Sequence, residues 1–220
     1  MEELLSKIAH CVEFGKVDKT APYPPDMKGQ EGADELTKQA IEQGIPAETI
    51  LKEALVIGMD KVGVKFSEKK IFIPQMLMSA KAMNAAIEHL KPFFQSGEVK
   101  RKGKFIIATV QGDLHDIGKN LVKMSIEGAG WEVIDLGVDV KAEKVIASIE
   151  QNPGAIVGLS ALLTTTMANM KNSVADIKAK YPESIVMVGG APVSQGFCNE
   201  IGADFYAPDP QAAVAFLKAK

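Results

Sequence analysis

Gly112-Asp113-Leu114-His115-Asp116-Ile117-Gly118-Lys119-Asn120 follows an apolar run at 105–110 that predicts a buried strand. A helix is expected to begin near Ile117, directly after this stretch. The order places the imidazole of His115, with Asp113 two residues before it, at the carboxyl end of a strand. Ligands bind at that end of the strands in open α/β sheets, so we expect the functional site here.

Two further short motifs follow apolar runs in the same way. Ser160-Ala161-Leu162 follows the run at 155–159, and Gly189-Gly190 follows the run at 184–188. If these runs are parallel strands, all three motifs lie at one edge of one sheet. The glycines would remove side chains where a ligand runs into the sheet. The helix beginning at Ile117 would offer backbone N–H groups to a phosphate.

Composition excludes several classes of protein. The chain has 220 residues, 46% of them hydrophobic, and a net charge of −3, so a basic nucleic-acid-binding surface is not expected. No apolar run approaches the roughly 20 residues of a membrane span. The acidic start, Met1-Glu2-Glu3-Leu4, lacks a signal-peptide pattern. Two cysteines fit neither a disulfide framework nor a zinc site, and we expect a cytoplasmic protein.

The first 95 residues show helical periodicity and predict a four-helix bundle. We expect helices near 4–12, 31–43, 47–64 and 74–91, the last ending at Lys91-Pro92. Asp18 to Gln30 has three prolines and no periodicity, so we interpret it as a loop. Ser96 to Lys104 is polar and contains glycine, which is typical of a linker.

Residues 105–220 alternate apolar runs with helical patterns, which predicts a parallel sheet covered on both faces. Strands are expected near 105–110, 131–136, 155–160, 184–188 and 204–206. Helices are expected near 117–129, 142–151, 165–180, 195–201 and 210–218. Five strands suit a Rossmann-like sheet of flavodoxin-like order 2-1-3-4-5. Its switch point lies between the first and third strands, where the Asp113 and Ser160 motifs meet.

The three motifs together resemble the signature of cobalamin-binding domains that hold the corrinoid base-off, with a protein histidine on the cobalt. The whole chain resembles the small corrinoid proteins of anaerobic methyltransfer systems, and the cobalamin module of methionine synthase. In these, a helical cap (here 1–95) and a linker (96–104) precede the cobalamin-binding domain (105–220). Phe72–Ala80, Gly158–Met167, Val188–Pro192 and Tyr206–Asp209 also carry the resemblance. The Pro-rich stretch Thr20–Gly29 departs from it, being longer than expected between the first two helices.

The resemblance implies a role for each matching residue. His115 would be the lower cobalt ligand, with Asp113 hydrogen-bonded to it and Ser160 hydrogen-bonded to Asp113 in turn, as a relay. Gly189 and Gly190 would line the pocket of the nucleotide tail. Further cofactor contacts would come from Gly112, Leu114, Asp116, Ile117, Gly118, Leu162, Thr164, Thr165, Ala191, Met76, Met78, Tyr206 and Pro208. The threonines Thr164 and Thr165 could instead serve only to cap a helix.

The family resemblance implies a methyl shuttle rather than an enzyme with its own substrate pocket. A donor-specific methyltransferase would place a methyl group on cob(I)alamin, and a second would pass it to tetrahydrofolate or a thiol. A reductive activase would be a further partner. Similar proteins serve methylamines, methanol, methoxyarenes and quaternary amines, and the motifs do not distinguish among these donors.

Two other classes of cobalamin protein share the motif. The cobalamin subunit of a carbon-skeleton mutase lacks a matching helical cap. A cobalamin-sensing regulator needs a DNA-binding module, whereas residues 1–95 carry 12 basic and 14 acidic side chains. The methyl carrier is therefore the favoured hypothesis.

Overall fold

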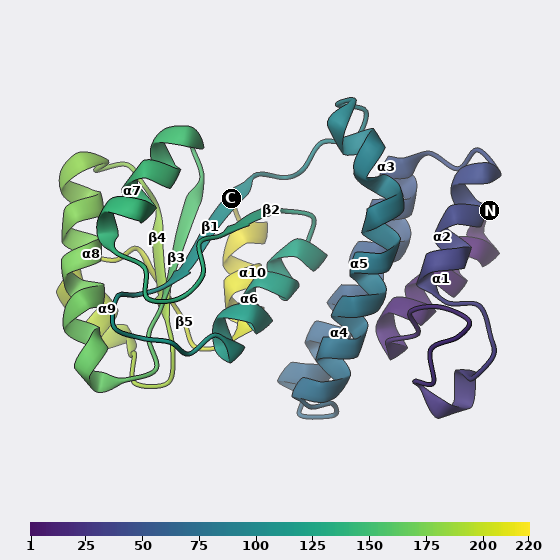
Figure 1. Cartoon of the computed structure of the whole chain (residues 1–220), viewed down its shortest axis with the longest axis horizontal. Helices are drawn as coiled ribbons and strands as arrows, with labels where there is room; N and C mark the ends of the chain where they lie inside the picture. The colour runs from purple at the N-terminus through teal and green to yellow at the C-terminus, as the bar shows by residue number, and fades with distance from the viewer. The chain divides into compact units, whose positions relative to one another are not determined.

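The computed structural model describes residues 1–220, which form two compact units (Figure 1). The first unit comprises residues 1–101 together with 128–130, and the second comprises 102–127 together with 131–220. The boundary at Arg101 falls inside the segment 96–104 that the sequence marks as a linker. No helix has both the length and the apolar character needed to cross a membrane.

The first unit is a helical bundle in which α1 contacts the three other long helices. Its elements are α1 (Glu2–Phe14), η1 (Pro25–Met27), α2 (Ala33–Glu42), α3 (Ala47–Ile50), η2 (Leu51–Leu55), α4 (Val56–Ser67) and α5 (Ile73–Gln95). The helical backbone continues from α3 through the π-helical turn η2 into α4, so 47–67 corresponds to the single third helix predicted from the sequence. The loop before α2 is fixed by Asp18, whose Oδ1 accepts hydrogen bonds from the backbone of Thr20 and Ala21.

The predicted end of the last cap helix at Lys91-Pro92 is wrong. Helix α5 passes through Pro92 and ends at Gln95. Proline inside a helix removes one hydrogen bond and crowds the preceding turn. The turn after Pro92 still closes, because the backbone N–H of Ser96 donates to the Pro92 carbonyl at 2.9 Å. One missing bond therefore does not end a helix whose next turn remains paired.

The second unit is a five-stranded parallel sheet in the order β2-β1-β3-β4-β5, as the sequence predicts. The strands are β1 (Lys104–Thr109), β2 (Glu132–Asp135), β3 (Ile156–Ser160), β4 (Val186–Gly189) and β5 (Phe205–Ala207). The helices are α6 (Ile117–Gly128), α7 (Ala142–Gln151), α8 (Met167–Lys180), α9 (Gln195–Ile201) and α10 (Pro210–Lys218), with a short turn η3 (Thr164–Thr166) before α8. Figure 1 shows α7, α8 and α9 on one face of the sheet, and α6 and α10 on the other.

The two faces of the sheet are packed differently. The face under α7, α8 and α9 carries large apolar side chains, such as Ile106, Val157 and Val188, which are buried in one hydrophobic cluster. On the other face, the alternation of side chains brings Ile107, Gly158 and Met187 together across three strands. The packed face stabilises the sheet, and a cavity lies on the face that carries Gly158.

Truncation of a fully buried side chain on the packed face should lower the free energy of unfolding more than truncation of a partly buried one. Ile106→Ala removes a side chain that is 0% exposed, and we expect it to lower the free energy of unfolding by about 2–5 kcal/mol. Ile146→Ala on α7 is the matched control, because Ile146 is only partly buried and should cost clearly less. Urea unfolding followed by fluorescence of Trp131, the single tryptophan, measures both. Equal costs at the two positions would contradict this description of the core.

Candidate functional site

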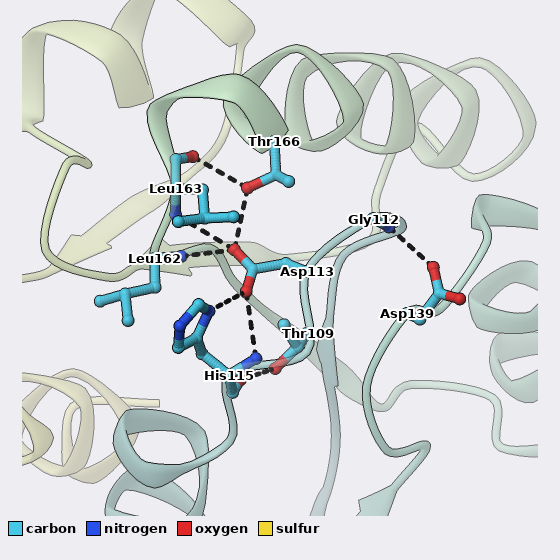
Figure 2. A network of polar contacts seen from close by, with 8 residues as sticks. All are labelled: Thr109, Gly112, Asp113, His115, Asp139, Leu162, Leu163 and Thr166. Atoms are coloured by element: carbon cyan, nitrogen blue, oxygen red, sulfur yellow. Dashed lines mark hydrogen bonds and ion pairs between the residues drawn. The ribbon is translucent and has the colours of Figure 1, made fainter.

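The Asp113 carboxylate is the centre of the site (Figure 2). It is fully buried, and both of its oxygens accept hydrogen bonds. Oδ1 accepts from the backbone N–H of His115 at 3.1 Å and lies 2.7 Å from the ring nitrogen Nδ1. Oδ2 accepts from the backbone N–H groups of Leu162 at 2.7 Å and Leu163 at 3.2 Å, and from Thr166 Oγ1 at 2.9 Å. One carboxylate thereby joins the segment after β1 to the segment after β3.

These hydrogen bonds keep Asp113 ionised despite its burial. Burial by itself would raise the pKa of the carboxyl. The hydrogen bonds from the Leu162 backbone, from the ring and backbone of His115 and from Thr166 outweigh it, and they hold the pKa well below its ordinary value. Asp113 is therefore a carboxylate at neutral pH and can only accept hydrogen bonds.

The charge of Asp113 determines which nitrogen of His115 is free. A carboxylate has no hydrogen to give, so Nδ1 donates its own to Oδ1 in the neutral ring. The lone pair then lies on Nε2, which is the arrangement of a metal-binding imidazole whose other nitrogen is held by a carboxylate. The side chain of His115 is 50% exposed, so an external ligand can reach it. The chain has no cluster of three or more His, Cys, Asp or Glu side chains able to hold a metal ion.

Two further residues hold the segment that carries His115, and the sequence motifs predict neither of them. Thr109, the last residue of β1, donates its hydroxyl to the His115 carbonyl at 2.9 Å. Asp139 accepts from the backbone N–H of Gly112 at 2.7 Å and donates its own N–H to the Asp113 carbonyl at 3.0 Å (Figure 2). Asp139 has a positive φ of 53°, a conformation tolerated by aspartate. Its position just beyond the carboxyl end of β2 is the sequence signal that could have indicated it.

The predicted hydrogen bond from Ser160 to Asp113 is wrong in this structure. Thr166 supplies the hydroxyl instead, because the turn η3 brings it within hydrogen-bonding distance of the carboxylate. Ser160 ends β3 between Thr109 and Gly189, and it lines the neighbouring cavity. Both Thr164 and Thr165 are exposed and lie outside that cavity.

A cavity of about 660 Å³ lies beside His115, within the second unit. Its walls come from α6, from β1, β3, β4 and β5, and from the segment leading into α10, and most of its side chains are apolar. The structure brings most of the sequence-predicted residues to it, namely Leu114, His115, Asp116, Ile117, Gly118, Ser160, Leu162, Gly189, Gly190, Ala191, Tyr206 and Pro208. Asp113 and Gly112 do not line the cavity. Their hydrogen bonds position the segment that carries His115.

The two methionines predicted from the cap also lie outside this cavity. The side chain of Met76 is buried, with 0% of it exposed. Met78 is half-buried, and its Cβ lies 2.7 Å from where a Cβ on Gly15 would stand. Met78 thus packs against the carboxyl end of α1, and a role of either methionine toward a cofactor stays a prediction.

The sequence predicts that Gly190 makes room for a ligand. In the structure, glycine is required at 190 because another segment of the chain lies against it. Gly190 has a φ of +123°, and a Cβ there would stand 1.8 Å from the carbonyl oxygen of Ala161. The close approach of the segments after β3 and β4 therefore excludes any side chain. At Gly118, by contrast, a Cβ would meet nothing within 4 Å, which leaves open space at the start of α6.

Exposed apolar side chains surround His115. Leu114 is 72% exposed and Ile117 is 65% exposed, and Leu162 and Leu163 are also exposed. Several large apolar side chains in the open around one imidazole mark a binding surface rather than an ordinary protein exterior. A parallel α/β unit with one carboxylate-held histidine at the mouth of an apolar cavity defines a protein that binds a large cofactor.

Comparisons with known proteins identify the family. One family of B12 binding domains matches residues 103–215, and a second family of B12 binding domains matches residues 29–91. The chain is 39% identical over 185 residues to a corrinoid protein of Desulfitobacterium hafniense, covering 82% of this chain and 86% of the relative. It is 37% identical over 220 residues to dimethylamine corrinoid protein 1 of Methanosarcina acetivorans, covering 99% and 97%. The chain therefore belongs to the corrinoid proteins, the family with B12 binding domains.

A solved structure resembles the whole chain. The methanol:cobalamin methyltransferase complex of Methanosarcina barkeri contains a chain that matches with a TM-score of 0.83 and 31% identity. The match covers 99% of this chain and 79% of that chain. The family and the fold predicted from the sequence are thus both confirmed.

The hydrogen-bond pattern of Asp113 predicts different effects for two hydroxyl deletions. Thr166→Val keeps the shape but removes a donor to a buried carboxylate, and should lower the free energy of unfolding by about 1.5–3 kcal/mol. Ser160→Ala removes a hydroxyl that makes no hydrogen bond to Asp113. This variant should change the free energy of unfolding by about 0.5 kcal/mol or less. Urea unfolding of the ligand-free protein compares them, and a larger cost for Ser160→Ala would restore Ser160 as the partner of Asp113.

Proposed function

We propose that the protein is a methyl carrier that binds cobalamin or a related corrinoid, base-off, with His115 as the lower ligand of cobalt. The observation that carries this proposal is the free Nε2 of His115, fixed by the buried charge of Asp113 at the mouth of an apolar cavity. When bound, the corrinoid supplies a cobalt ion that can accept and release a methyl group.

The residues present fit such a cofactor. His115 would hold the cobalt, which arrives with its remaining ligands already in the macrocycle. The exposed side chains of Leu114, Ile117 and Leu162 would contact the macrocycle through their apolar surface. The cavity that opens beside His115 would receive the nucleotide tail, with Gly189 and Ser160 in its lining.

The protein's own contribution is to hold the imidazole in one orientation. Asp113 fixes the Nδ1–H tautomer and strengthens Nε2 as a donor. Leu162, Leu163 and Thr166 in turn hold Asp113, so the ring is tied to both β1 and β3. A ligand held in place in advance loses little freedom when the metal binds.

We further propose that the partners are methyltransferases and that no substrate is bound by this chain itself. A donor-specific methyltransferase would load the carrier, a second would unload it to tetrahydrofolate or a thiol, and a reductive activase would restore an inactivated cofactor. The likeness to a chain of a methanol:cobalamin methyltransferase complex and to a dimethylamine corrinoid protein supports a partner that supplies the donor.

His115→Ala should abolish the histidine ligation and weaken corrinoid binding by about tenfold or more, as expected when a metal ligand is lost. The absorbance spectrum, and the nitrogen splitting in the electron paramagnetic resonance of the Co(II) form, report the ligand when the bound corrinoid carries a base without nitrogen, such as p-cresol. His10→Ala is the matched control, because His10 is an exposed histidine on α1 of the first unit. Unchanged spectra in His115→Ala would refute the assignment.

Methyl transfer itself is tested with the loaded protein. The cobalamin-bound protein, reduced and mixed with a dimethylamine or methanol methyltransferase and its donor, should become methylated within the assay. The upper ligand that copurifies also separates the alternatives, since an adenosyl group indicates a mutase subunit or a regulator. Copurification of adenosylcobalamin, with no methylation by any tested methyltransferase, would replace the carrier hypothesis.

A further inference from the structure

The cavity beside His115 has a polar mouth and an apolar interior. The strand register places Thr109, Ser160 and Gly189 on one rung, and Ile107, Gly158 and Met187 two residues earlier on the same face. The Ser160 hydroxyl therefore lies at the mouth. The interior rung presents only two aliphatic side chains and a glycine.

The wall opposite the sheet is also apolar at the interior end. Leu121 and Val122 of α6 line it. The ring of Phe105 covers Gly158, where a Cβ would stand 2.6 Å from the ring carbon Cζ. The interior is thus enclosed by hydrocarbon from both the helix and the sheet.

The charged residues of the lining are engaged elsewhere or lie at the mouth. The ammonium of Lys119 is held by Asp135 at 2.5 Å and by Asn120 at 3.2 Å. Asp116 lies just before α6 and accepts a hydrogen bond from Asn120. Asp209 lies just before α10 and accepts from the backbone N–H of Ala212.

The backbone offers no further hydrogen-bonding groups there. β1, β3 and β4 each lie between two other strands, so their N–H and C=O groups are committed to the sheet. A polar atom of a ligand that enters the interior would lose its water and find no partner. An unsatisfied buried donor or acceptor is costly, whereas an apolar atom in the same place is favourable.

This inference rests on the proposed function, in which the nucleotide tail of a corrinoid enters the cavity. We propose that the cavity selects among corrinoids by their lower base, and that it favours a benzimidazole or phenolic base over adenine. Once detached from cobalt, a benzimidazole presents one unpaired ring nitrogen, and a phenolic base joined through its oxygen presents none. Adenine presents several ring nitrogens and an amino group, all of which need partners.

The test compares four corrinoids on the full chain. These are cobalamin, a corrinoid with a p-cresol base, the adenine-bearing pseudocobalamin, and cobinamide, which has no nucleotide. Dissociation constants come from absorbance titration of the ligand-free protein. Cobalamin and the p-cresol form should bind at least about tenfold more tightly than pseudocobalamin, the effect of one or more unsatisfied polar atoms.

The p-cresol form also separates this inference from the proposed function. Its base has no nitrogen, so any axial nitrogen signal from its Co(II) form comes from the protein. Equal dissociation constants for all three complete corrinoids, with that signal present, would overturn the selectivity and leave the histidine ligation standing. Absence of the signal, or cobinamide binding as tightly as cobalamin, would overturn the proposed site itself and the selectivity with it.

Two variants test whether the lack of hydrogen-bond partners in the cavity causes the selectivity. Val122→Thr adds a hydroxyl to the half-buried α6 wall at nearly constant volume, and Val122→Ala is its control without a polar group. Met187→Gln adds an amide on the interior rung, with folding checked by circular dichroism. Val122→Thr should reduce the ratio of the dissociation constants of pseudocobalamin and cobalamin several-fold. Val122→Ala should leave this ratio unchanged. An unchanged preference in Val122→Thr would overturn the explanation by missing hydrogen-bond partners.

Discussion

The structure of the site depends on one buried negative charge. A carboxylate taken out of water is destabilised by several kcal/mol unless hydrogen bonds replace its solvation. Asp113 receives those bonds from groups that follow two different strands, so the loops after β1 and β3 must adopt one mutual arrangement to satisfy it. The position of His115 is a consequence of that requirement, because its ring is one of the donors.

The need to satisfy the Asp113 carboxylate also explains why so many of the site's hydrogen bonds come from the backbone. Leu162 and Leu163 contribute N–H groups, and their side chains remain exposed at the binding surface. Asp139 and Thr109 bind carbonyl and N–H groups of the His115 segment rather than its side chains. Side chains around the imidazole are therefore available for contact with a ligand, while the main chain maintains the geometry.

Much of this arrangement could be predicted from the sequence, because it follows from periodicity. Apolar runs separated by helical patterns gave the five strands and their order, and the rule for open sheets gave the switch point that carries Asp113 and Ser160. The parts that could not be predicted depend on local turns. Spacing does not reveal that η3 directs Thr166, rather than Ser160, toward Asp113. Nor does it reveal that Gly190 is fixed by the Ala161 carbonyl, or that α5 continues through Pro92.

The unequal packing of the two sheet faces has a consequence for cofactor exchange. Ile106, Val157 and Val186 belong to the hydrophobic cluster that packs against the sheet, and none of them lines the cavity. The hollow face can therefore be filled or emptied without loss of the strands that define it. The cavity is therefore present in the ligand-free fold, and the packing that holds its strands does not depend on a ligand.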